Sequence, residues 1–193
     1  MPLEKLNLTG QFLIAMPAMT DPFFSKTVTY ICTHNQDGAM GVIINRTADI
    51  SVVKLFQQIQ IEPENTSLLK KIVHFGGPVQ TERGFILHEP QDEYDATIVI
   101  SDKVALTTSK DILLASAENK GPQKMFIALG YAGWTAGQLE NELAQNAWLS
   151  LATDNLDDIH ALIFDKADHE KFDCAMRMIG LDLVNLSHHA GHA

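Results

Sequence analysis

Residues 28–45 read VTYICTHNQDGAMGVIIN, and their pattern predicts how the strands in the first part of the chain pair. Two runs of β-branched and apolar residues, 28–32 and 41–45, flank a polar segment that contains Asp37 and Gly38. β-Branched and aromatic residues favour strands, and an Asp-Gly pair favours a tight turn. The stretch therefore predicts an antiparallel hairpin.

Further strands and helices are expected on both sides of this hairpin. Apolar runs predict strands at 11–16, 72–75, 84–88, 96–101, 125–130 and 149–153. Apolar residues at helical spacing predict helices that start at the capping residues Ser51, Thr108, Thr135 and Asp154, and a last helix over 168–179 that stops at Gly180. Asp21-Pro22 predicts a short helical turn. Short hairpins with later helices favour an α+β or mixed α/β fold over a doubly wound parallel sheet.

Length and composition predict one domain over residues 1–193. A chain of this length with 46% hydrophobic residues buries roughly 70% of its unfolded surface. The apolar runs are far shorter than the ~20 residues of a membrane span. The N-terminus does not resemble an export signal, because Glu4 and Lys5 precede the apolar patch and Pro17 interrupts it. Cys32 and Cys174 form neither a C-x-x-C pair nor a disulfide framework, so we expect a cytoplasmic protein.

The charge of the chain disfavours direct contact with nucleic acid. The net charge is -10, and residues 154–182 carry eight acids that we expect on solvated helical faces. The sequence shows no basic cluster beyond Lys70-Lys71, whereas nucleic-acid binding relies on Lys and Arg to neutralise phosphates.

Common catalytic motifs are missing from the sequence. There is no G-x-S-x-G elbow, no phosphate-binding G-x-x-x-x-G-K-[ST] loop and no G-x-G-x-x-G fingerprint. His169-Glu170 begins like a zinc-protease helix, but position 173 is Asp where the second histidine would stand. The histidines of the tail at 188–192 stand at a chain end. We therefore assign no catalytic residue, no metal and no cofactor.

The segment GYAGW at 130–134 is interpreted as a glycine-rich turn between a strand and a helix. The helix amides beyond it could hold an anion, as phosphate-binding loops do. However, the motif contains no Lys or Arg, and Thr135 with Gln138 can cap the helix. A turn with a purely structural role is therefore favoured over an anion-binding loop. Trp134 would then pack over the core or line a pocket.

Several glycine-containing segments could frame one ligand-binding cleft. Arg46 is the natural anchor for an anion, since its planar guanidinium suits a carboxylate or a phosphate. The alternative is a strand-end arginine in a surface ion pair. The candidate cleft residues are Asn45, Arg46, Gly76, Gly77, Gly130, Gly133 and Trp134.

With these segments in place, the chain resembles the bacterial AlgH/YqgE family almost end to end. The resemblance rests on MTDPFF, VTYICTHNQDGAMGVIINR, FGGPVQTERGFILH, GYAGWTAGQLENELAQNAWL and a C-terminal GHA. Thr47 and Thr81 stand where the family pattern has proline. The resemblance implies a single domain with a bifurcated, partly barrel-like mixed sheet flanked by helices. Family members are often described as transcriptional regulators, without a recognised DNA-binding module or established catalytic residues.

Three functions remain open from the sequence. The favoured hypothesis is a non-enzymatic binding or regulatory protein that acts through a protein or a small-ligand partner. An alternative is a hydrolase or transferase for an anionic substrate, which requires Arg46, Gly76-Gly77 and Trp134 to border one pocket with a titratable group, such as His74, His88 or Asp102. A direct DNA regulator would need a basic surface that the sequence does not show.

Overall fold

The computed structural model describes residues 6–181, so the histidine-rich tail lies outside the described residues. Two runs of four strands, each followed by a helix, precede a more helical final section of this part of the chain. Their order is β1 (Phe12–Ala15), β2 (Val28–Asn35), β3 (Gly38–Ile43), β4 (Thr47–Ser51), α1 (Val52–Gln58), the 3-10 turn η1 (Leu68–Lys70), β5 (Ile72–Phe75), β6 (Val79–His88), β7 (Thr97–Val99), β8 (Ala105–Thr107), α2 (Asp111–Ala117), β9 (Met125–Thr135), α3 (Gln138–Ala144), β10 (Trp148–Leu151), α4 (Leu156–Phe164) and α5 (Asp168–Met178).

The predicted hairpin is confirmed, and it sits near the middle of a curled mixed sheet. β2 and β3 pair antiparallel with Tyr30 opposite Val42. The strand order is β10-β1-β2-β3-β9-β6-β8-β7, with β4 and β5 branching from β9. All described strand pairs are antiparallel except β5 with β9, which makes the sheet mixed. The α+β, single-sheet expectation is therefore confirmed.

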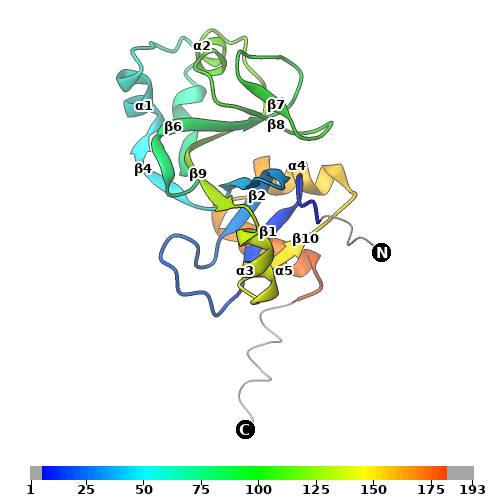
Figure 1. Cartoon of the computed structure of the whole chain (residues 1–193). Helices are drawn as coiled ribbons and strands as arrows, with labels where there is room; N and C mark the ends of the chain where they lie inside the picture. The colour runs from blue at the N-terminus through cyan, green and yellow to red at the C-terminus, as the bar shows by residue number, and fades with distance from the viewer. Residues whose placement is uncertain (1–5, 182–193) are drawn as a thin grey trace.

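Strand β9 is the point at which the sheet divides. Its first half, residues 125–129, lies between β5 and β6, whereas residues 132–135 pair with β3. Figure 1 shows β9 running from an upper part with α1, α2 and β6–β8 to a lower part with β1, β2, β10 and α3–α5. The bifurcated arrangement implied by the resemblance is thus present.

Three apolar clusters fill the space between the sheet and its helices. The first packs α4 and α5 against the strands of the hairpin and of β9, with Tyr30 and Phe126 among its members. The second lies under α1 and α2, around Phe56 and Ile127. The third lies beside α3 and contains Trp134 and Trp148. Helices α4 and α5 therefore share one apolar cluster, α1 and α2 share a second, and α3 covers the third.

The expectation that GYAGW forms a turn is wrong. β9 continues through Gly130 and Gly133 to Thr135, because its second half keeps pairing with β3 and Gly133 lies opposite Met40. The corner comes later, at Gly137, whose φ of 74° is the left-handed conformation that glycine adopts readily. A side chain does not cap α3, although the Thr135 N–H donates to Gln138 Oε1 at 3.0 Å.

The predicted helix caps are partly confirmed. The hydroxyl of Ser51 accepts from the Lys54 N–H at 3.2 Å, as expected. The cap of α4 is Asn155 rather than Asp154, and it accepts from the Asp157 N–H at 3.1 Å. The capping box at Thr108 is wrong. Helix α2 instead has Lys110 as its N-cap residue, without a side-chain cap, and the Thr108 N–H donates to Ala96 O at the end of the sheet.

The Asp21-Pro22 turn forms as predicted. The Asp21 carboxylate accepts from the Phe23 N–H at 2.8 Å, and the Ser25 N–H donates to Asp21 O at 2.9 Å.

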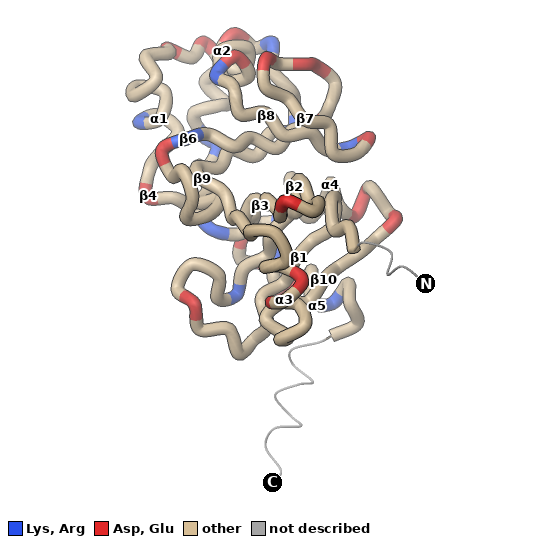
Figure 2. Tube along the Cα trace, viewed as in Figure 1, with Lys and Arg blue, Asp and Glu red and all other residues tan. Residues whose placement is uncertain are grey.

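Charged residues are found in both parts of the molecule (Figure 2). The acids expected on solvated faces are exposed at Asp154, Asp157, Asp158, Asp165, Glu170 and Asp173, whereas Asp168 is half-buried. Within residues 6–181 no helix has the length and apolar character needed to cross a bilayer.

Candidate functional site

Asn45 and Arg46, at the end of β3, hold the loop that precedes β2. The guanidinium of Arg46 donates to Pro22 O at 2.6 Å and to Ser25 O at 2.7 Å. The side-chain amide of Asn45 donates to Lys26 O at 2.9 Å, and its oxygen accepts from the Val28 N–H at 2.8 Å. Arg46 is therefore bound to carbonyls, and the surface ion pair considered as an alternative is absent from the described residues.

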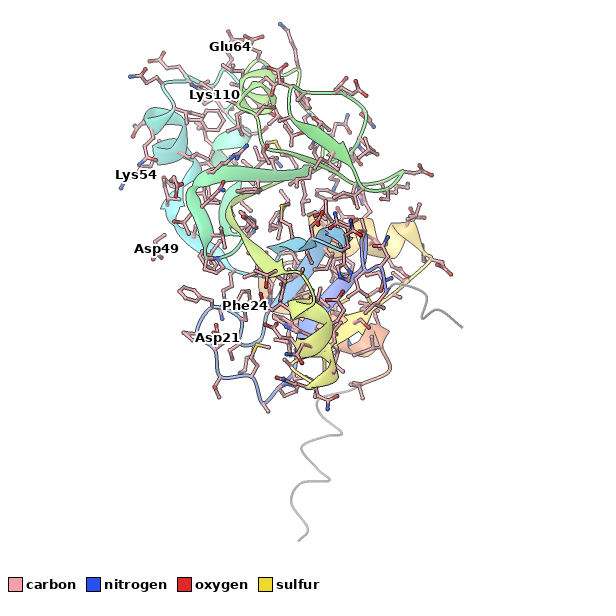
Figure 3. The ribbon with its side chains drawn as sticks, in the orientation of Figure 1. Asp21, Phe24, Asp49, Lys54, Glu64 and Lys110 are labelled. Atoms are coloured by element: carbon pink, nitrogen blue, oxygen red, sulfur yellow. The ribbon has the colours of Figure 1, made fainter. Side chains whose placement is uncertain are left out.

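A groove of about 640 Å³ opens beside Arg46, and we call it the Arg46 groove. Its apolar lining comes from the loop before β2, from β4 and α1, and from β5 and β9. Arg46, Asp49 and Glu82 add polar groups to the lining. In Figure 3, Asp49 on β4 and Asp21 on the loop before β2 lie on the same side of the molecule. The main apolar residues are Pro22, Phe23, Ile50, Leu55, Phe75 and Leu129.

Phe23 is the most exposed aromatic surface in this groove. Its side chain is 47% exposed and stacks on Phe75, with ring centroids 5.9 Å apart and an interplanar angle of 22°. An aromatic ring left in water at the wall of a groove offers a large apolar area to a ligand or a partner. The loop that carries Phe23 is also the loop that Arg46 fixes, so the ring is held in place.

Gly133 and Trp134 lie at a second hollow of about 530 Å³, over β2, β3 and β9. Trp134 is only 6% exposed, and its indole N–H donates to Glu142 Oε2 at 2.9 Å. It is therefore mainly a core residue whose edge reaches the hollow. The Arg46 groove and this hollow share none of their lining residues.

Gly76, Gly77 and Gly130 line neither hollow, because they pack against backbone. A Cβ added to Gly76 would lie 2.3 Å from Gly130 O, and one added to Gly77 would lie 2.0 Å from the carbonyl carbon of Tyr131. Strands β5 and β9 are also joined here, since the Gly76 N–H donates to Leu129 O at 2.8 Å. These glycines let the chain cross closely where the sheet divides.

The seven candidate residues therefore do not form one cleft. The structure brings Asn45 next to Arg46, and Gly133 next to Trp134, but separates the two pairs. The condition set for a hydrolase or transferase, with Arg46, Gly76-Gly77 and Trp134 around a single pocket, is not met. Ligand binding by the individual residues stays a prediction.

The three titratable groups considered for a hydrolase or transferase site, His74, His88 and Asp102, also lie apart from one another. His88 is fully buried, and its ring contacts Thr107 Oγ1 at 2.7 Å and Glu89 O at 2.8 Å. Burial lowers the pKa of His88, against the opposing effects of its bond to Glu89 and the charge of Asp92. Asp102 lies exposed on the loop after β7. Of the three, His74 reaches a pocket.

That third pocket, of about 420 Å³, was missed by the sequence reasoning, and we call it the lysine pocket. It lies between η1–β5 on one side and the connection from α4 to α5 on the other. The adjacent lysines at 70–71 were the part of this pocket visible as a local basic pattern in the sequence. The residues that lie across the pocket from them, 163–171, come from much later in the chain. The polar lining is Lys70, Lys71, His74, Lys166, Asp168, His169 and Lys171.

An ionic cluster of the buried His74 and Lys171 with the half-buried Asp168 forms the floor of the lysine pocket. His74 Nε2 lies 3.0 Å from Asp168 Oδ2, and Lys171 Nζ lies 3.1 Å from Asp168 Oδ1. Lys171, 2% exposed, also donates to Ile44 O at 2.7 Å and to Ile163 O at 3.1 Å. Burial lowers the pKa of Lys171, and the charge of Asp168 opposes that change. Within residues 6–181, no group of three or more His, Cys, Asp or Glu side chains is arranged so that it could hold a metal ion.

Known proteins resemble the chain over nearly its whole length. A family model described as AlgH-like matches residues 12–184. A UPF0301 protein of Thiobacillus denitrificans is 52% identical over 192 residues, which cover 99% of this chain and 100% of the relative. A UPF0301 protein of Nitrosospira multiformis is 44% identical over 191 residues, with 99% and 100% covered.

Two solved structures are similar in fold. The solution structure of the AlgH protein from Pseudomonas aeruginosa is 41% identical, with a TM-score of 0.78 and 100% of both chains covered. The crystal structure of protein DIP2367 from Corynebacterium diphtheriae has a TM-score of 0.67 and 18% identity, covering 88% of this chain and 86% of the other. The latter likeness concerns the fold alone.

Proposed function

The chain belongs to the AlgH-like family, and from that premise we propose that it is a non-enzymatic binding or regulatory protein that acts through a protein partner. The observation that carries the proposal is the Arg46 groove, which combines an apolar hollow with a strand edge. The partner docks with an extended segment that lies along β4.

Strand β4 offers backbone groups for such docking. In the described part of the chain, β4 pairs with β5 along one edge and no strand pairs with the other. Residues 47–50 of this strand line the groove. An edge strand presents free N–H and C=O groups, and an added strand from a partner gives affinity through main-chain hydrogen bonds.

The groove also supplies specificity for side chains. Phe23, Ile50 and Leu129 form an apolar wall that an alternate side chain of the incoming segment can fill. Asp49 and Glu82 lie at the same groove, whereas the charge of Arg46 already faces two carbonyls. We therefore infer a segment with one large apolar residue next to a Lys or an Arg.

The proposal places the protein in the cytoplasm, acting without direct DNA contact. Both cysteines are free thiols, and Cys32 is buried, which raises the pKa of its thiol and makes it unreactive. Free thiols suit a reducing compartment. A net charge of -10 disfavours long-range attraction to a duplex and favours a partner with basic residues.

A photo-crosslinking experiment tests the proposal. A photoreactive phenylalanine analogue at the exposed groove residue Gln58 should capture a defined protein in bacterial cells, and the purified partner should bind the wild-type chain in calorimetry. Phe23→Ala and Ile50→Asp should each weaken that binding by about tenfold or more. Leu114→Ala is the control, because Leu114 is 43% exposed on α2 away from the groove. Equal binding by the groove variants and the control would overturn the proposal.

A further inference from the structure

We propose that the lysine pocket binds a small organic anion with two adjacent phosphate groups and an apolar body, such as a nucleoside diphosphate. This site is separate from the Arg46 groove, since the two share no lining residue. Its volume of about 420 Å³ lies within the ordinary range for small-ligand pockets. The argument rests on the charges that line it.

Three lysines in the pocket have no partner of their own. Among residues 6–181, the ammonium groups of Lys70, Lys71 and Lys166 take part in no hydrogen bond or ion pair. The nearby Lys124, by contrast, is paired with Asp165. In a chain with 24 acids and 14 bases, acidic partners are plentiful. Unpaired cations gathered at one hollow therefore indicate a place for an anion from outside the chain.

Within residues 6–181, the floor of the pocket offers no free carboxylate oxygen to these lysines. Among the described residues of the lining, Asp168 is the only acid, and both of its oxygens are occupied, by His74 and by Lys171. The other ring nitrogen of His74 lies 3.1 Å from Ile127 O. Both oxygens of Asp168 are therefore already engaged within the floor and are not free to pair with the other lysines of the pocket.

The pKa of Lys71 agrees with the lack of an acidic partner within residues 6–181. Burial lowers the pKa of Lys71, and the positive charge of Lys124 lowers it further. A carboxylate partner would have the opposite effect. A bound phosphate would supply the missing negative charge and favour the protonated form of Lys71.

The start of α5 gives the pocket backbone donors as well. Ala167, Asp168 and His169 line the pocket, and α5 has 11 residues. Its N-cap residue is Ala167, which has no side chain able to accept from the first amides. Free N–H groups and the positive end of the helix dipole favour an anion at this point. The unpaired lysines and the first residues of α5 thus line the same hollow.

An apolar wall selects an organic ligand over a bare inorganic ion. Ile72 is 51% exposed, and it lines the pocket together with Met125 and Phe164. A base or another flat apolar group can lie against this wall while its phosphates meet the lysines. The combination fits a nucleotide better than inorganic phosphate alone.

Titration calorimetry of the full chain at low salt tests the inference. ADP and GDP should bind, pyrophosphate should bind about tenfold more weakly, and adenosine should not bind. Binding of ADP should weaken steeply as salt is added. No heat from ADP or GDP, equal binding of adenosine, or equal binding of pyrophosphate would each overturn the assignment.

Variants locate the binding at this pocket. The double variant Lys71→Gln/Lys166→Gln should lose at least about tenfold in ADP affinity, and Lys71→Arg/Lys166→Arg should retain most of it. The control is Lys54→Gln, which removes one positive charge on α1, outside the pocket (Figure 3). Far-UV circular dichroism confirms that each variant is folded. If Lys54→Gln weakens binding as much as the double variant, the lysine pocket is not the site.

Discussion

Trp134 and Trp148 meet edge to face and share one hydrogen-bond acceptor. Their ring centroids are 5.8 Å apart at an interplanar angle of 78°. The indole N–H of Trp134 lies 2.9 Å from Glu142 Oε2, and that of Trp148 lies 2.8 Å from the same oxygen. Both rings are buried, so a single carboxylate on α3 satisfies two donors that come from β9 and β10.

Glu142→Ala should lower the free energy of unfolding by about 2–4 kcal/mol, because it leaves two buried indole N–H groups without an acceptor. Chemical denaturation followed by tryptophan fluorescence measures this loss. Glu142→Gln should cost less, since the amide oxygen can still accept. Glu93→Ala, at an exposed acid, is the control. A Glu142→Ala variant as stable as the control would contradict the role of the shared carboxylate.

Gly77→Ala should destabilise the chain by about 3 kcal/mol or more, since the new Cβ would collide with the backbone of Tyr131. The matched control is Gly84→Ala in β6, where the nearest atom to an added Cβ is 4.0 Å away. Thermal melting of the two variants side by side tests the difference. Equal melting temperatures for the two variants would contradict the close packing of Gly77 against the backbone of Tyr131.

Arg46→Ala should release the loop 22–27 and cost about 2 kcal/mol, because two charge-assisted hydrogen bonds to Pro22 O and Ser25 O are lost. Limited proteolysis should then cut this loop faster than in the wild type. Arg177→Ala, at an exposed arginine of α5, should leave the cleavage rate unchanged. Unchanged cleavage of Arg46→Ala would show that the guanidinium does not fix the loop.

Acid should weaken the fold partly through Asp168. Burial raises the pKa of Asp168, but the hydrogen bond and charge of His74 and the charge of Lys171 lower it more, so the net pKa is below its ordinary value. The ionised group therefore contributes stability above the unfolded pKa, and this contribution is lost as pH falls through the folded pKa.

Urea denaturation between pH 7 and pH 3 measures the effect. The wild type should lose stability below about pH 4, at up to about 1.4 kcal/mol per pH unit for one proton. Asp168→Asn should be less stable at pH 7 and should show a shallower acid dependence. Asp154→Asn, at an exposed acid, should keep the wild-type slope. Identical slopes for all three chains would exclude Asp168 as a contributor.

Local patterns predicted the elements whose signals lie within a few residues. The hairpin at 28–45, the Ser51 cap and the Asp21-Pro22 turn all depend on short-range chemistry, and all three are present. Gly180 likewise follows the last helix with a φ of 80°, the conformation expected after a helix end.

Long-range pairing explains what the sequence could not predict. GYAGW has the composition of a turn, yet β3 pairs with its second half and keeps it extended. Glycines 76, 77 and 130 suggested a ligand cleft, but they allow strands to approach each other. The lysine pocket joins residues 70–74 to residues 163–171, and no local motif reports that proximity.

Strand β9 has one consequence for how cooperatively the molecule unfolds. Its first half is held by β5 and β6, and its second half by β3, so one covalent segment is common to both parts of the sheet. Melting monitored by indole fluorescence and by amide circular dichroism should therefore give superimposed curves, whereas a split would contradict the coupling. Because β9 belongs to both parts of the sheet, we expect the two parts to unfold together.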